Sequence, residues 1–299
     1  MSADSTAGLV INIITFLIGF PNTVLAFCSC IRKIHSKPLP IDIFMLNLTV
    51  SDLIFLTFLP VKIKEAADDM VWNMPYILCH FNMFMVFIPL HTTSLFLAAI
   101  SAERYVCVRF PVKYKSQRRN LYTILICVAI WVLVIIVIVF AHEAAYTNPE
   151  KKEPLRCYRD FTPTQLRNLN EVRLAVLGLF SLTPFIIYCF CYINVIHILL
   201  KLPLINRCRR LRAIGLALGT FLLWTVCYAP ISVSYIVGYI RKEDPKWRTE
   251  ALMLTTLNAC FDIIIFFCIS KEMRKAVGVC ANAFFQLYVY SKRFMLLCP

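Results

Sequence analysis

The sequence predicts an all-α membrane protein, a bundle of seven transmembrane helices, and three observations lead to this prediction. The chain of 299 residues is 60% hydrophobic and only 16% charged, with a mean hydropathy of +0.71. Soluble domains carry roughly 45–50% apolar and about 25% charged residues. Seven long stretches hold almost no charge, and Lys and Arg gather in every second segment between them. This composition excludes a soluble enzyme of this size and a disordered chain.

Each apolar stretch has roughly the ~20 residues that a helix needs to cross a bilayer. Helices are expected because a lone strand or loop leaves its backbone polar groups unsatisfied in lipid. We expect one membrane domain over residues 1–270, and an amphipathic eighth helix with a short tail over 271–299, where Cys280 is a candidate for palmitoylation. The expected spans are residues 8–31, 42–63, 79–106, 121–141, 173–200, 212–240 and 249–269.

The charge distribution predicts the orientation in the membrane. Residues 31–41, 103–120, 201–212 and the tail from residue 271 together hold 19 of the 31 Lys and Arg, but with the adjacent Asp42 only three of the 17 Asp and Glu. Because cytoplasmic loops of membrane proteins are enriched in Lys and Arg, this side is predicted to be cytoplasmic. The N-terminus is then extracellular and the C-terminus cytoplasmic. The basic inner face also suits anionic membrane lipids.

Two carboxylates lie inside expected spans, Asp52 in the second and Asp262 in the seventh. Ionisable groups are costly in lipid and mark functional sites by default. If both face the interior, they can share a cation such as sodium or hold one proton, with Asn258 one turn before Asp262. The alternative is a pair of carboxylates that are hydrogen-bonded separately.

Of the 14 cysteines, only Cys79 and Cys157 fall on the predicted extracellular side. Disulfides form in oxidising compartments, so these two are expected to pair and to hold the second outer loop over the bundle.

Two arginines stand at the outer ends of spans, Arg173 in the fifth and Arg248 in the seventh. Each can extend to the membrane surface, or it can point inward and bind an anion, since a guanidinium pairs well with a carboxylate. Periodicity alone does not decide between the two. The sequence shows no catalytic constellation, so no enzyme activity is expected. A retinal pump is disfavoured because the seventh span has no Lys, and a transporter because no repeat is visible.

Over nearly its whole length the chain resembles the rhodopsin-like (class A) G-protein-coupled receptors. The residues that carry the resemblance are Asn47 and Asp52, Trp72, the Cys79–Cys157 pair, Glu103-Arg104-Tyr105, Trp131, Pro184 and Tyr192, and Cys227 to Pro230. The resemblance implies activation and G-protein coupling through Glu103, Arg104, Tyr105, Tyr192, Trp224 and Tyr228. It also implies heterotrimeric G proteins (Gi/o or Gq) and arrestin as partners, no nucleic acid, and no cofactor apart from a sodium ion.

Within this class the chain looks most like the free fatty acid receptors, especially the short-chain types 2 and 3. The resembling stretches are residues 58–67, 97–105, 157–158, 172–174, 233–239, 247–248 and 257–259. The resemblance implies that Arg173 and Arg248 hold the carboxylate of a short-chain fatty acid at the plasma membrane. The residues expected around this carboxylate depart from the family. Tyr235 stands where the family usually has a His and Ile231 where it usually has a Tyr, and Phe87 and His91 stand at the positions of pocket tyrosines.

Another departure concerns signalling. Class A receptors usually carry a Pro and a Tyr shortly after the position of Asp262, and residues 262–266 contain neither. Two alternatives therefore remain open at this point. The protein can be a receptor for hydroxycarboxylic or other organic anions, or a receptor-like protein with impaired signalling.

Overall fold

The computed structural model describes residues 3–36, 38–116, 120–146, 157, 161–201, 214–215 and 219–262. Every regular element within these residues is a helix, so the expected all-α fold is confirmed. The expected eighth helix, Cys280 and the last part of the seventh span lie outside the described residues.

The helices are α1 (Ala3–Ser36), α2 (Pro40–Ala67), α3 (Tyr76–Arg109), α4 (Pro111–Ser116), α5 (Asn120–Tyr146), α6 (Pro163–Leu177), α7 (Thr183–Lys201), α9 (Ala229–Arg241) and α10 (Arg248–Thr256). Two π-helical turns, η1 (Gly178–Leu182) and η2 (Trp224–Tyr228), complete the set. The helix α6–η1–α7 is continuous, and helical residues 219–223 lead into η2 and α9. Among the described residues, six helices are long and apolar enough to cross a membrane, with mean hydropathy from 1.6 to 3.5.

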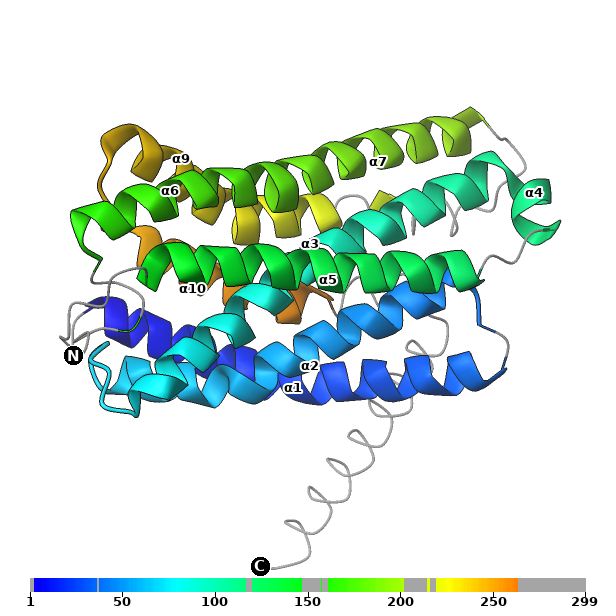
Figure 1. Cartoon of the computed structure of the whole chain (residues 1–299). Coiled ribbons are helices and arrows are strands. Elements are labelled where there is room, and N and C mark those ends of the chain that lie inside the picture. Colours follow the sequence, from blue (N-terminus) through cyan, green and yellow to red (C-terminus); the bar gives the residue numbers. More distant parts are fainter. Residues whose placement is uncertain are drawn as a thin grey trace, which may run out of the picture.

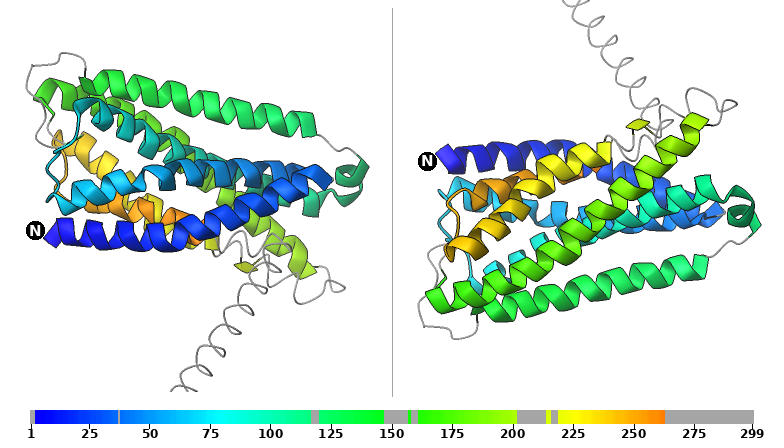
Figure 2. Two further views of the ribbon diagram at one scale, coloured as in Figure 1. Left: turned by 90° about the horizontal axis from the view of Figure 1, so that it is seen from below. Right: turned by 90° about the horizontal axis from the view of Figure 1, so that it is seen from above.

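The long helices lie side by side as a bundle (Figure 1 and Figure 2). The N-terminus and the α2–α3 and α9–α10 connections lie at one end, which we call the disulfide end, and α4 lies at the other. α3 runs through the middle, and 72% of its most apolar window is buried, against 22% for α5. This difference explains why α5 is apolar all around, since most of its surface is left for lipid.

Two prolines coincide with the π-helical turns. Pro184 has no N–H to donate to the carbonyl of Phe180, four residues earlier. The hydroxyl of Ser94 on α3 donates to that carbonyl instead, at 2.8 Å. Pro230 is the second residue after η2, the same position that Pro184 has after η1. π-helical turns inside α-helices are frequent at functional sites, and here they mark the two helices that carry Arg173 and Trp224.

The expected disulfide is present: the sulfurs of Cys79 and Cys157 are 2.11 Å apart. Cys79 lies in the first turn of α3 and is fully buried. The bridge therefore fixes Cys157 to the central helix, next to the site described below.

Candidate functional site

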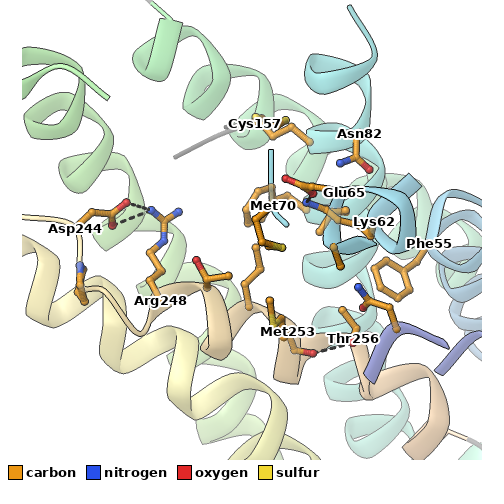
Figure 3. A pocket seen from close by; sticks show the side chains of 18 of the residues that line it. Phe55, Lys62, Glu65, Met70, Asn82, Cys157, Asp244, Arg248, Met253 and Thr256 are labelled. Carbon is orange, nitrogen blue, oxygen red and sulfur yellow. Dashed lines mark hydrogen bonds and ion pairs between the residues drawn. The ribbon is translucent and has the colours of Figure 1, made fainter. Parts of the chain in front are cut away.

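Arg173 and Arg248 converge at the disulfide end of the bundle. Arg173 comes from α6 and Arg248 opens α10, and only 5% and 8% of these residues are exposed. Both guanidinium groups donate to one carboxylate, that of Asp244. Figure 3 shows the contact of Arg248 with Asp244. The Nη1–Oδ1 distances are 3.2 Å from Arg173 and 2.8 Å from Arg248, and Arg248 also reaches Oδ2 at 2.6 Å. The two side chains point inward, so they do not extend to the membrane surface.

The connection between α9 and α10 places Asp244. Lys242 ends α9 in the left-handed conformation, with φ 56°, and turns the chain back. The backbone N–H of Arg248 then donates to the carbonyl of Pro245 at 3.0 Å, which starts α10 one turn after Asp244. An acid four residues before an arginine lies on the same face of such a turn.

Neighbouring residues hold Arg173 in place. Its Nη1 donates to the side-chain oxygen of Asn170 at 3.0 Å, and the amide of Asn170 donates to the carbonyl of Gly238 at 3.1 Å. This chain of hydrogen bonds ties α6 to α9. The ring of Phe161 lies 5.6 Å from the guanidinium, at a distance suited to a cation–π contact. Arg173 is thus fixed by contacts that do not depend on Asp244.

Asp244 was not among the residues that the sequence pointed to. The available signal was its position four residues before Arg248, in a connection rich in charge. Asp244 keeps 27% of its side chain exposed, while the two arginines are almost wholly covered. The three side chains together carry one net positive charge, so the site favours an anion.

The site borders two cavities of very different size. A small one, of about 20 Å³, is lined by Phe87, His91 and Tyr235 together with both arginines. A large one, of about 420 Å³, is also lined by Arg248 and shares Phe87 with the small one. Ile231 is buried and lines neither cavity. His91 is also buried, with its ring stacked 5.0 Å from that of Phe180.

The two buried carboxylates come together deeper in the bundle. Asp52 and Asp262 are 3% and 0% exposed, and lie close enough to share a hydrogen bond. Thr93 donates to Asp52 at 3.4 Å and Asn258 to Asp262 at 3.0 Å. Three oxygens have no hydrogen-bond partner among the described residues: Asp52 Oδ2, Asp262 Oδ1 and Asn258 Oδ1. Three such oxygens fit a cation or a shared proton.

The residues implied in activation lie along the core toward the α4 end. Tyr228 donates to the carbonyl of Leu90 at 3.1 Å, and Ser101 donates to the hydroxyl of Tyr192 at 2.9 Å. The indole of Trp224 stacks 3.9 Å from Phe185. These contacts join α3 to α7 and η2.

At the α4 end, Tyr114 bonds to Glu103, and burial together with this carboxylate raises the pKa of the Tyr114 phenol above its ordinary value. Arg104 is largely covered, and its Nε has no hydrogen-bond partner among the described residues. Tyr105 contacts Phe190 edge to face at 5.6 Å.

The helical bundle and the positions of the residues described above are typical of one class of membrane receptor, and a comparison with known protein families agrees. The sequence profile of the seven-transmembrane receptors of the rhodopsin family matches residues 22–273. The chain belongs to this family, and it is a receptor rather than an enzyme.

Its relatives include free fatty acid receptors 2 and 3. The chain is 36% identical to free fatty acid receptor 3 of Rattus norvegicus over 270 residues, which cover 88% of this chain and 83% of that receptor. It is 37% identical to the Homo sapiens receptor 3 over 263 residues, covering 86% and 75%. It is 36% identical to the Homo sapiens free fatty acid receptor 2 over 275 residues, covering 90% and 83%.

Asp244→Asn is expected to lower the melting temperature of the purified, ligand-free protein more than Arg248→Gln does. Asparagine leaves two buried guanidinium groups without their shared carboxylate, whereas glutamine leaves one Asp244–Arg173 pair intact. The loss of the carboxylate should cost about 1–3 kcal/mol, a shift of several degrees. Glu243→Gln, which removes an exposed charge next to Asp244, should change little. An equal or larger loss in Arg248→Gln would show that Asp244 does not neutralise both arginines.

Proposed function

We propose that this protein is a G-protein-coupled receptor for free fatty acids with short chains, and that the ligand carboxylate binds between Arg173 and Arg248. The observation that carries the proposal is that these two buried arginines already hold one carboxylate, that of Asp244. The names of the related receptors support the ligand class. Phe87, His91 and Tyr235 surround the same place as neutral neighbours.

The ligand carboxylate takes the place of Asp244 in this account. Each charge-assisted hydrogen bond contributes roughly 1.5–3 kcal/mol. Displacing Asp244 offsets part of this gain, and a short chain buries few apolar atoms. Binding is therefore weak, as expected for a ligand with few atoms.

Displacement of Asp244 also provides the link to signalling. Asp244 follows α9, so its contact with Arg173 joins the sixth span to the fifth. Once released, α9 and η2 lose that restraint, and Trp224 and Tyr228 repack. The ligand shifts the receptor toward the active state only by the difference between its affinities for the two states.

At the cytoplasmic side, Glu103, Arg104, Tyr105 and Tyr192 face a heterotrimeric G protein of the Gi/o or Gq type, and arrestin after activation. The N-terminus is extracellular and the α4 end cytoplasmic, in agreement with the basic loops. The protein then stands in the plasma membrane with its arginines open to extracellular acids.

The buried carboxylates form the second part of the proposal. Asp52, Asp262 and Asn258 would hold a sodium ion, which neutralises charge between the second and seventh spans. The oxygens without partners support this assignment. A shared proton is the competing occupant.

One observation favours a second candidate function. Residues 262–266 lack the Pro and Tyr that class A receptors usually carry there. A receptor-like protein that binds the acid but signals poorly is therefore the alternative, together with a receptor for other organic anions.

Arg173→Gln and Arg248→Gln should each raise the half-maximal concentration of propionate in a G-protein activation assay by roughly ten- to a hundredfold. Each variant removes one charged donor to the ligand carboxylate. The assay also compares carboxylates of increasing chain length with the corresponding primary amides. The amides should be inactive. Arg167→Gln changes an exposed arginine on the same helix, α6, and serves as the matched control, with surface expression measured for all.

If both arginine variants respond like the parent, the carboxylate does not bind there. If propionate raises the melting temperature of the parent but activates no G protein, the impaired-signalling alternative is favoured.

Sodium, in exchange for choline at constant ionic strength, should raise the melting temperature of the parent protein, because an ion that binds only the folded state stabilises it. Asp52→Asn should abolish this rise, since it removes one of the two carboxylates. Glu143→Gln, whose side chain is 72% exposed, should keep it. The same rise in Asp52→Asn would rule out a sodium site at this pair.

A further inference from the structure

The large cavity is a chamber between four spans at the disulfide end. It has a volume of about 420 Å³ and is lined by residues of α1, α2, α3 and α10 and of the α9–α10 connection. Apolar side chains supply much of the wall: Phe55, Met70, Met83, Val86, Leu252 and Met253. Figure 3 shows Asp244 and Arg248 on one side of it, with Lys62, Glu65 and Asn82 across from them.

The chamber is far larger than a short-chain acid requires. A cavity of about 150 Å³ accommodates a benzene molecule, so the chamber has room for nearly three such groups. The small cavity beside Arg173 has only about 20 Å³. Since Arg248 borders both cavities, a carboxylate held there has space for its chain in the chamber and not in the small cavity.

Two amides in the chamber wall lack partners. Asn82 on α3 is 1% exposed and Asn12 on α1 is 5% exposed. The side-chain oxygen of each has no hydrogen-bond partner among the residues that the structure describes. Buried polar groups are nearly always hydrogen-bonded, so each of these acceptors calls for an explanation. A donor on a bound molecule supplies one.

The charges around the chamber indicate that this donor is neutral. Lys62 and Glu65 pair with each other at 2.8 Å, and Arg248 pairs with Asp244. A charged group at the far wall would meet a lysine and a glutamate that already neutralise one another. A hydroxyl is the smallest neutral group that donates a hydrogen bond to an amide oxygen.

We propose that the chamber binds the chain of a carboxylate whose head lies at Arg248, and that the side-chain oxygen of Asn82 accepts a hydrogen bond from a hydroxyl group at the far end of that chain. The preferred ligand is then a hydroxylated fatty acid of intermediate length. This inference rests on the proposed function for the carboxylate site, and it replaces the short chain of that proposal by a longer chain with a second polar group.

The test compares ω-hydroxy acids of about four to twelve carbons with the unsubstituted acids and with their ω-methoxy analogues, which accept but do not donate. Apparent affinities come from the ligand-dependent rise in melting temperature of the purified receptor, a readout independent of G proteins. At one length, the hydroxy acid should bind about fivefold or more tighter than both analogues.

Asn82→Leu, which removes the side-chain oxygen without a partner and keeps a side chain of similar size, should fold normally and lose this preference. Its affinity for propionate should stay within about twofold of the parent. Asn168→Leu, an exposed position on α6, is the matched control and should keep the preference.

No preference for the hydroxy acid at any length, or an unchanged preference in Asn82→Leu, overturns the chamber assignment while propionate binding persists. If propionate does not bind the parent, the proposed function itself fails and the chamber assignment fails with it. The two failures are thus distinguishable.

Discussion

One carboxylate between two buried arginines organises the disulfide end of this receptor. Arg173 and Arg248 belong to helices distant in sequence, and both are almost fully removed from water. Two guanidinium groups this close repel each other unless an anion lies between them, and in a medium of low dielectric constant that repulsion is large. Asp244 supplies the anion. This contact joins the α9–α10 connection to the start of α10 and to α6.

The same contact gives an external acid a way to act on the bundle. A ligand carboxylate can satisfy the arginines in place of Asp244, but it does not tether them to α9. The fifth and sixth spans each contain a π-helical turn next to a proline, at η1 and η2. π-helical turns are frequent at functional sites, and in the proposed mechanism the loss of a restraint at one end of α9 is transmitted through them to Trp224 and Tyr228.

Much of the fold could be predicted from the sequence, because spans are set by hydropathy and length. The bounds of the helices could not, since α1 and α3 continue beyond the apolar stretches into polar ends. The pairing of Cys79 with Cys157 was predictable because they share a compartment. Arg173 was identified, yet its inward direction depends on Asn170 and Gly238, which come together only through tertiary packing. The sequence did not point to Asp244 or to the chamber, because both depend on tertiary packing. Asp244 meets Arg173 only in the folded bundle, and the chamber wall is assembled from four spans. Ile231, which the family resemblance places near the ligand, lies in the core away from both cavities.

The central claim is that Asp244 and the ligand carboxylate compete for the same two arginines. The most direct test is the dissociation constant of propionate for Asp244→Asn, measured on purified receptor beside Glu243→Gln. Removing the internal competitor should tighten propionate binding by about tenfold, while Glu243→Gln, which removes the same charge from the neighbouring exposed position, leaves it unchanged. Unchanged or weaker binding in Asp244→Asn would contradict the account.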